Sequence, residues 1–233
     1  MRTVTLVGHR GDPYVARENT LPSLLAAVER GADAVEVDVR LTRDGVPVLL
    51  HDDTLKRLWG DDRPLARLSH AELTELTRGR VPTLHEALTA VGGHRLMLDL
   101  PGADESSVRA VAGAVRDSGA ADRVYYCGGL AAMVAVRAAD PGAEIALTWT
   151  TLAPPRPVLL DVLRPRWLNY RFGLVSQELA DRVHADGLLL SAWTADTRRT
   201  MRRLVRGGVD SITTNRVGTL AAVLRTMQAS KSR

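Results

Sequence analysis

Short apolar segments alternate with longer segments of helical periodicity along the chain, and this alternation limits the fold more than any other feature. Apolar runs of about four to eight residues between turn residues are typical of strands, and amphipathic stretches are typical of helices. Strands that alternate with helices form βαβ units, so their strands lie parallel in one sheet. The expected strands are Thr3–Gly8, Ala34–Leu41, Arg95–Leu100, Val124–Cys127, Glu144–Trp149, Trp167–Tyr170, Leu188–Ala192 and Asp210–Thr213. The helical segments between them include Pro22–Arg30, Leu84–Val91, Ser106–Ser118, Ala131–Ala139, Gln177–Ala185, Thr197–Gly207 and Val217–Met227.

Eight such units favour a closed barrel over an open sheet. The chain has 233 residues, and barrels of this kind use about 200–250 residues as one domain. A doubly wound open sheet is the alternative, but no Gly-x-Gly-x-x-Gly motif follows the first expected strand. We therefore expect an α/β fold, a single (β/α)8 TIM-type barrel over residues 1–228, followed by a polar tail over residues 229–233.

The segment between the second and third expected strands is longer than the others. Arg43-Asp44-Gly45 predicts a turn, and the apolar run Val46–His51 follows it. This pattern is typical of a β-hairpin that continues the second strand. A polar stretch and a short helix come next. We interpret residues 42–82 as an insertion over the barrel mouth and not as a separate domain.

Composition and charge argue against several classes of function. The 31 basic and 27 acidic residues give a net charge of +4, and aromatic residues make up 4% of the chain. Nucleic-acid binders more often show a dense basic stripe with stacking aromatics. The single cysteine, Cys127, excludes an intrachain disulfide and a thiolate zinc cluster. We expect no nucleic-acid partner, and the sequence does not fix the oligomeric state.

The apolar segments are too short for a membrane protein. No run approaches the roughly 18–20 apolar residues that a membrane span needs. The first apolar run ends at His9 and Arg10, which is too early for a signal-peptide core. We therefore expect a cytoplasmic protein with no stable membrane insertion.

The second expected strand carries two acidic side chains on one face. Side chains alternate along a strand, so Glu36 and Asp38 share the face opposite the three valines of that strand. In a barrel the valines pack outward against helices, and the carboxylates then point inward. Two buried carboxylates about 7 Å apart repel each other and lose hydration, so they need a nearby cation. Asp99 on the third strand is expected to point inward too. Three inward carboxylates form an oxygen site suited to Ca²⁺ or Mg²⁺.

Two of the six histidines lie where barrel enzymes place their active sites. His9 ends the first expected strand, and His51 ends the hairpin run. Active sites of such barrels lie at the carboxyl ends of the strands. A pair of histidines beside three carboxylates is typical of a general acid and a general base. The other histidines lie on expected helices or their flanking turns, and we interpret them as surface or packing residues: His70, His85, His94 and His184.

These residues, in this order, resemble the glycerophosphodiester phosphodiesterase family. Each short match alone is weak, but the joint order and spacing over the first 52 residues is specific, and the later matches extend it over nearly the whole chain. The matching stretches are Gly8-His9-Arg10-Gly11, Glu18-Asn19-Thr20, Glu36-Val37-Asp38, Asp44-Gly45, Val48, His51-Asp52, Pro82-Thr83-Leu84, Trp193-Thr194 and Gly208-Val209-Asp210.

The resemblance implies a TIM-type barrel and metal-dependent cleavage of glycerophosphodiesters to sn-glycerol 3-phosphate and an alcohol. The attacking oxygen is that of water or of the glycerol 2-hydroxyl. Carried over by position, His9 is assigned as the base and His51 as the acid. The remaining roles are the metal ligands Glu36, Asp38 and Asp99, the phosphate contact Arg10, the pocket-lining Trp193, and the supporting residues Glu18 and Asn19, of which Asn19 is alternatively a plain helix N-cap.

The sequence departs from the family pattern on the third strand. The family commonly has Glu-x-Lys where this chain has Asp99-Leu100-Pro101. The aspartate keeps a carboxylate, one methylene shorter, and is similar to the residue in the sphingomyelinase D branch. The proline removes a cation expected near the phosphate. Arg40, on the same face of its strand as Glu36, is a candidate to replace that charge.

Three other functions stay open at this point. One is a lysophospholipid or sphingolipid phosphodiesterase on the same site, with an acyl groove lined by residues 55–68. Another is a barrel that binds phosphodiesters without turnover, for which Pro101 is the main support. A phosphoinositide-type lyase barrel also uses two histidines and a cation, but the matches at Glu18-Asn19-Thr20 and Asp44-Gly45 favour the first family.

Overall fold

The computed structural model describes residues 4–229, and residues 230–233 of the expected polar tail lie outside them. Eight parallel strands form a closed barrel in the order β1-β9-β8-β7-β6-β5-β4-β2, and pairing of β1 with β2 closes it. The barrel predicted from the sequence is confirmed. Its strands are β1 (Thr5–His9), β2 (Ala34–Leu41), β4 (Arg95–Asp99), β5 (Val124–Gly128), β6 (Ile145–Trp149), β7 (Trp167–Arg171), β8 (Leu189–Trp193) and β9 (Ser211–Thr214).

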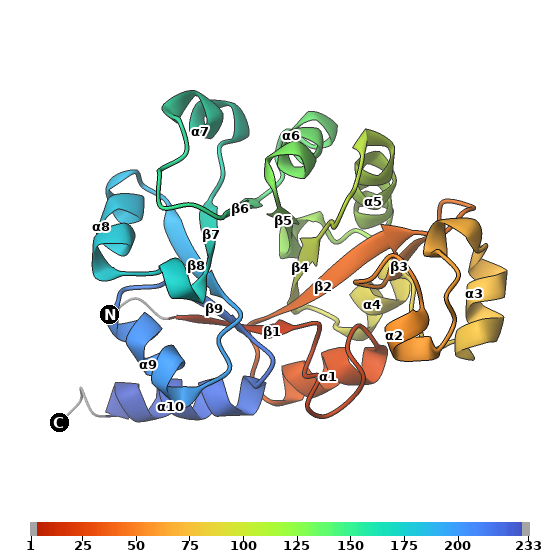
Figure 1. The fold of residues 1–233 in the computed structure, drawn as a ribbon, viewed down its shortest axis with the longest axis horizontal. Coiled ribbons are helices and arrows are strands. Elements are labelled where there is room, and N and C mark those ends of the chain that lie inside the picture. Colours follow the sequence, from red (N-terminus) through yellow and green to blue (C-terminus); the bar gives the residue numbers. More distant parts are fainter. Residues whose placement is uncertain (1–3, 230–233) are drawn as a thin grey trace.

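Helices surround the barrel on its outside (Figure 1). Seven follow the predicted segments, and α7 is an additional short helix that begins at a proline. They are α1 (Leu21–Glu29), α4 (Leu84–Ala90), α5 (Glu105–Asp117), α6 (Leu130–Ala139), α7 (Pro157–Leu163), α8 (Gln177–Ala185), α9 (Arg198–Arg206) and α10 (Val217–Ala229). Among the residues that the structure describes, no helix is both long enough and apolar enough to cross a membrane.

The apolar core has two parts, which follow from the alternation of side chains along the strands. The valines of β2 are buried in the layer between strands and helices, where Leu24 of α1 and Val111 of α5 also lie. A smaller cluster fills the barrel itself and includes Val7, Tyr125 and Trp167. The rings of Tyr125 and Trp167 stack near the start of their strands. The polar side chains of the barrel interior therefore lie toward the carboxyl ends of the strands.

The segment between β2 and α4 forms the predicted hairpin. Strand β3 (Pro47–Leu49) pairs antiparallel with the end of β2, with Val39 opposite Leu49. Three short elements follow, namely α2 (Lys56–Trp59), the 3-10 turn η1 (Leu65–Arg67) and α3 (His70–Thr77). They enclose an apolar cluster of their own, separate from the barrel core. These elements lie together at one side of the barrel, beside the end of β2 (Figure 1).

Candidate active site

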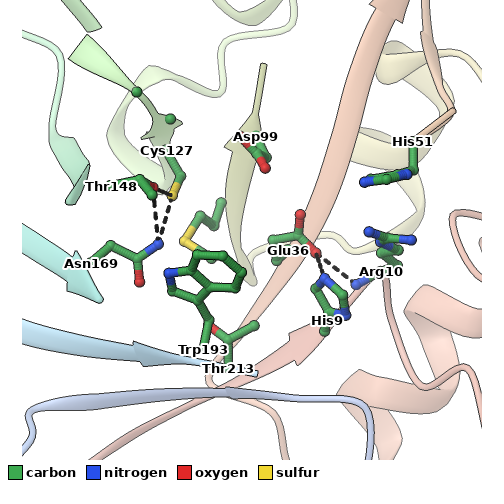
Figure 2. A pocket seen from close by; sticks show the side chains of 13 residues that line it. His9, Arg10, Glu36, His51, Asp99, Cys127, Thr148, Asn169, Trp193 and Thr213 are labelled. Carbon is green, nitrogen blue, oxygen red and sulfur yellow. Dashed lines mark hydrogen bonds and ion pairs between the residues drawn. The ribbon is translucent and has the colours of Figure 1, made fainter. Parts of the chain in front are cut away.

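A cavity of about 290 Å³ opens among residues at and beyond the carboxyl ends of the strands. Six of the residues predicted for the site line it, and Figure 2 shows them around the opening. The remaining three do not line it. Glu18 and Asp38 contact Arg10, and Asn19 contacts Asp38. The residues that line the cavity are His9, Arg10, Glu36, His51, Met97, Asp99, Cys127, Gly128, Gly129, Thr148, Asn169, Trp193 and Thr213.

Three carboxylates converge at one wall of this cavity. Strands β2 and β4 are neighbours, and their register places Asp38 opposite Asp99 and Glu36 opposite Met97. Glu36 and Asp38 are two residues apart and therefore share a face. One oxygen from each of Glu36, Asp38 and Asp99 lies within 4.8 Å of the others. The period-two pattern of β2 thus brings together the three acids that the sequence singled out.

Burial makes this acidic cluster electrostatically unfavourable by itself. Loss of hydration, followed by the charges of Asp38 and Asp99, raises the pKa of the Glu36 carboxyl well above its ordinary value, even with Arg10 in contact. Burial, followed by the charge of Asp38, raises the pKa of Asp99 to about 6. Hard oxygen donors in this arrangement are what Ca²⁺ and Mg²⁺ prefer in proteins. The three residues therefore fit a divalent cation, which would supply the missing positive charge.

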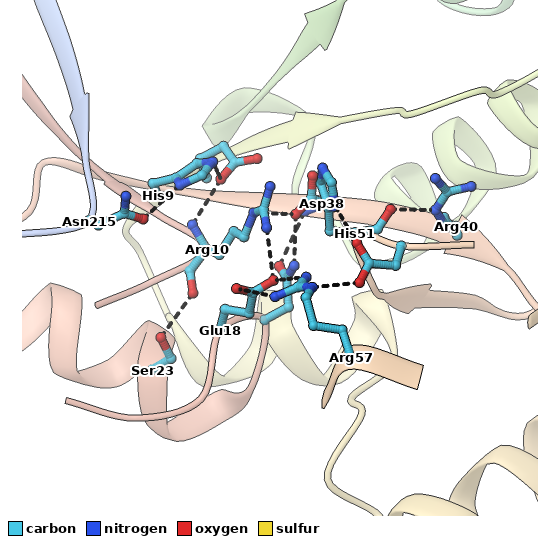
Figure 3. Close-up of polar contacts among 12 residues, drawn as sticks. His9, Arg10, Glu18, Ser23, Asp38, Arg40, His51, Arg57 and Asn215 are labelled. Atoms are coloured by element: carbon cyan, nitrogen blue, oxygen red, sulfur yellow. Dashed lines mark hydrogen bonds and ion pairs between the residues drawn. The ribbon is translucent and has the colours of Figure 1, made fainter. Parts of the chain in front are cut away.

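Arg10 connects the acidic cluster to the loop after β1. Its backbone N–H donates to Glu36 Oε2 at 2.8 Å, and its Nη1 donates to Glu18 Oε1 at 2.8 Å. Its Nε lies 3.0 Å from Asp38 Oδ2 (Figure 3). Within residues 4–229, Nη2 has no hydrogen-bond partner. Arg10 is thus held rigidly at the cavity and keeps one donor for an anionic ligand.

The backbone at Gly8-His9-Arg10-Gly11 requires its glycines. Gly11 has a φ of +89°, and a Cβ there would lie on the backbone of Ser23. A Cβ on Gly8 would lie 2.7 Å from the Gly11 carbonyl oxygen. The Ser23 hydroxyl donates to the Arg10 carbonyl at 2.9 Å, which fixes this turn against the start of α1. The two glycines therefore allow the backbone segments to approach closely, and this packing places His9 and Arg10 at the cavity.

Asn19 supports Asp38 and does not cap a helix. Thr20 occupies the position before α1, so the alternative interpretation of Asn19 as a plain N-cap is wrong. The Asn19 side-chain amide donates to Asp38 Oδ2 at 2.7 Å, and its oxygen accepts from the Asp38 backbone N–H at 3.2 Å. Asn19 also adopts a φ of +55°, which asparagine tolerates better than most residues. Both contacts hold Asp38 in the acidic cluster.

The ring of His9 is fixed by two residues that sequence reasoning missed. His9 Nδ1 lies 2.8 Å from Asn215 Oδ1, and the Asn215 amide nitrogen donates to Asp196 Oδ2 at 2.8 Å. Because the Asn215 oxygen faces the ring, Nδ1 carries the proton and donates it. Nε2 is then the free acceptor, 3.8 Å from Glu36 Oε2. Burial, then the charge of Arg10, lowers the pKa of His9, so the ring is neutral and basic at neutral pH.

His51 is oriented by a chain of charges from the insertion. His51 Nδ1 donates to Asp52 Oδ1 at 2.7 Å, and Asp52 Oδ2 accepts from Arg57 Nε at 2.7 Å. Arg57 also donates to both oxygens of Glu18 (Figure 3). The hydrogen bond from Arg57 is the main reason that the pKa of Asp52 falls to about 2. Asp52 stays ionised and orients the His51 ring through Nδ1.

The opposite wall of the cavity is polar and incompletely hydrogen-bonded. Asn169 of β7 donates to Cys127 Sγ at 3.1 Å and to Thr148 Oγ1 at 3.2 Å. Three buried atoms, Asn169 Oδ1, Trp193 Nε1 and Thr213 Oγ1, have no partner among the described residues. Buried polar atoms normally have partners, so this wall is suited to the hydroxyl groups of a ligand. Burial raises the pKa of the Cys127 thiol, which excludes it as a nucleophile at neutral pH.

Pro101 and Arg40 lie outside this cavity. Both line a neighbouring cavity between the β2–β3 hairpin and the loop after β4. Among the residues that line the active-site cavity, Arg10 is the sole arginine or lysine. The structure therefore does not place Arg40 where the sequence comparison expects a lysine beside the phosphate.

Comparison with known proteins agrees with this geometry. The model of the glycerophosphoryl diester phosphodiesterase family matches residues 9–219. A glycerophosphodiester phosphodiesterase of Caldanaerobacter subterraneus is 27% identical, over 97% of this chain and 99% of that protein. A crystal structure of a glycerophosphodiester phosphodiesterase from Parabacteroides distasonis is 25% identical, with a TM-score of 0.83, over 97% of this chain and 98% of that one.

A further solved structure is similar in fold. It is an Oleispira antarctica phosphodiesterase in complex with its product sn-glycerol-3-phosphate, 24% identical, with a TM-score of 0.85 over 94% of this chain and 96% of that one. The family match includes both histidines, the acidic cluster and the tryptophan of the site. This chain belongs to the glycerophosphoryl diester phosphodiesterase family.

Proposed function

We propose that this protein hydrolyses glycerophosphodiesters to sn-glycerol 3-phosphate and an alcohol, with a divalent cation held by Glu36, Asp38 and Asp99. The observation that carries the proposal is the clustering of these three acids, two of which line the same cavity as His9 and His51. Membership in the family supports the reaction class, a phosphoric diester hydrolase. The product complex of the Oleispira antarctica protein supports the identity of the product.

The phosphodiester of the substrate is an anion and resists nucleophiles. A cation at the acidic cluster supplies positive charge to the non-bridging oxygens of the phosphate. Arg10 donates to the same phosphate through Nη2, while Glu18 and Asp38 keep its guanidinium in place. Asn19 keeps Asp38 in position.

Two proton transfers complete the reaction. His9 accepts the proton of the attacking oxygen at Nε2, because Asn215 holds the proton of Nδ1. His51 donates its Nε2 proton to the leaving alcohol oxygen, and Asp52 orients the ring through Nδ1. The attacking oxygen is that of water or of the glycerol 2-hydroxyl, and the latter forms a cyclic phosphate first.

The unpartnered atoms of the opposite wall orient the substrate. Asn169 Oδ1 can accept from a glycerol hydroxyl, and Trp193 Nε1 can donate to one. The glycerol moiety then lies deep in the barrel. The alcohol head group lies on the side of His51, which protonates its oxygen.

The burial of Leu55 and Leu68 in the insertion favours water-soluble diesters over long-chain ones. The lipid alternative needs an exposed acyl groove lined by residues 55–68. In the structure Leu55, Leu65 and Leu68 are buried in the apolar cluster of the insertion. Leu65 also lines the neighbouring cavity of about 510 Å³, together with Pro64 and Ala66.

A substrate panel tests the proposal. We expect release of glycerol 3-phosphate from glycerophosphocholine, glycerophosphoethanolamine and glycerophosphoglycerol with Ca²⁺ or Mg²⁺ present. A lysophospholipid and a lysosphingolipid serve as the comparison, and we expect slower turnover of both. Turnover of the long-chain diesters alone would assign the lipid function instead, and turnover of none would leave a binding protein.

A further inference from the structure

Two cavities adjoin the active site on the side of His51. One, of about 590 Å³, is lined by His51, Asp53 and Arg40, and the other, of about 510 Å³, by Arg40, Asp53 and Pro101. His51 also lines the active-site cavity. The active-site cavity shares His51 with the first of these cavities, and the first shares Arg40 and Asp53 with the second, so the neighbouring cavities mark a path outward from His51. We call this path the head-group groove and define it by Arg40, His51, Asp53, Thr54 and Pro101.

Arg40 presents an unused cation to the groove. It lies two residues beyond Asp38 on the same face of β2, where this strand extends past the barrel. Its Nε donates to the His51 carbonyl oxygen at 2.8 Å, so the side chain is fixed beside His51 (Figure 3). Its Nη1 and Nη2 make no hydrogen bond, ion pair or ring contact within the described part of the chain. Two parallel N–H donors on a fixed guanidinium match a carboxylate.

Asp53 presents an unused anion to the same groove. It lines both cavities together with Arg40. Its backbone carbonyl accepts from Leu65 N–H at 2.8 Å, which fixes the backbone. Its carboxylate has no partner among residues 4–229 and does not pair with Arg40. Two opposite charges that line the same cavities suit a ligand that carries both charges.

The other charged side chains of the groove are already paired. Arg57 is bound by Asp52 and Glu18, and these contacts belong to the chain that orients His51. The remaining pairs are Lys56 with Asp62 at 2.8 Å, and Arg43 with Glu72 at 3.1 Å and with the Arg67 carbonyl at 2.8 Å. Arg40 and Asp53 are therefore the charges that a ligand reaches without breaking an existing contact.

We propose that the head-group groove binds the alcohol end of the substrate and selects a zwitterionic, amino-acid-type head group. The carboxylate of that head group binds Arg40, and its ammonium group binds Asp53. The inference rests on the proposed function, in which the alcohol leaves on the side of His51. The substrate class is a glycerophosphodiester of an amino-acid alcohol, of which glycerophosphoserine is the accessible example.

A matched pair of substrates tests the carboxylate contact. Glycerophosphoserine and glycerophosphoethanolamine differ by one carboxylate. We expect kcat/KM to favour glycerophosphoserine by about tenfold, the size of one charge-assisted contact, mainly through KM. Arg40→Gln should abolish this preference, and Arg40→Lys should keep part of it. Arg43→Gln removes the same charge from the same groove, but from a side chain held by Glu72, and should leave the preference unchanged.

A separate variant tests the ammonium contact. Asp53→Asn should lower kcat/KM for both substrates relative to glycerophosphoglycerol, whose head group is uncharged. An unchanged ratio would overturn the role of Asp53.

Three results would overturn the role of Arg40. The first is the absence of a preference in the unmodified protein. The second is an equal loss for both substrates in Arg40→Gln, because Arg40 would then act only through the His51 carbonyl. The third is loss of the preference in Arg43→Gln as well. The preference would then come from the overall positive charge of this region and not from a contact with Arg40. Release of glycerol 3-phosphate from no substrate would overturn the proposed function and this inference with it, whereas turnover without selectivity overturns the inference alone.

Discussion

Glu36→Gln is expected to lower kcat/KM for glycerophosphocholine by roughly 1000-fold, the size of losing a charge-stabilising group at a reacting phosphate. Glutamine keeps the shape of the side chain but removes one of three carboxylates that converge within 4.8 Å. Glu105→Gln is the matched control, because Glu105 is an exposed residue of α5. Activity within tenfold of the unmodified protein would show that Glu36 does not hold the cation.

The same variant should change stability in the opposite direction. In metal-free buffer Glu36→Gln removes a carboxylate that burial and the charges of Asp38 and Asp99 disfavour, so the thermal midpoint should rise by a few degrees at pH values where Glu36 is ionised. The further rise that Ca²⁺ or Mg²⁺ causes in the unmodified protein should be absent from the variant. Differential scanning calorimetry with and without metal measures both effects. A lower midpoint in metal-free buffer would contradict the electrostatic description of the cluster.

The sign of the pH dependence follows from Asp99. Its pKa in the folded protein, about 6, lies above its ordinary value of 3.8. The folded state therefore binds the proton more tightly, and the ionised carboxylate costs stability above about pH 6. That cost decreases as the pH falls from about 6 to about 4, so the metal-free protein should gain stability from this group over that range. Metal binding should weaken over the same range, because protons compete with the cation.

His9→Ala and His51→Ala are each expected to lower kcat by about 100- to 10,000-fold, the usual contribution of a positioned acid or base. His85→Ala on the exposed face of α4 is the matched control and should retain full activity. The stabilisation by Ca²⁺ or Mg²⁺ should persist in both histidine variants, because neither residue is among the three carboxylates. Near-full activity of either variant would contradict its role.

A change of leaving group separates the two histidines. In a glycerophosphodiester of p-nitrophenol, p-nitrophenolate leaves without a proton, so the reaction needs no general acid. We expect this substrate to restore much of the lost rate to His51→Ala but not to His9→Ala. The reverse pattern would exchange their assignments, with His51 as the base.

The sequence predicted the barrel because its signals are local. Each strand is a short apolar run, and the acidic face of β2 follows from the period of two along a strand. Helix α7 was not among the named segments because it exposes Val158 and Val162, so its amphipathic pattern is weak. The domain boundaries, the roles of the site residues and the cytoplasmic location remain predictions.

The missing parts of the site are contacts between distant segments. Asn215 lies 206 residues from His9 in the sequence, and a residue that directly follows β9 was the one available signal for it. Arg57 lies in a polar stretch with no pattern of its own. Arg40 lies on the predicted face of β2. However, β2 extends into the hairpin with β3, so Arg40 lies beyond the active-site cavity.

Metal titration of the stripped protein tests the central claim most directly. Glycerol 3-phosphate release and heat of binding are followed on the same sample as Ca²⁺ or Mg²⁺ is added after treatment with EDTA. We predict no release in EDTA, and a rise in activity that follows the filling of one site per chain and is absent in Glu36→Gln. Full release of glycerol 3-phosphate from the EDTA-treated protein would contradict a cation at Glu36, Asp38 and Asp99 as the basis of its activity.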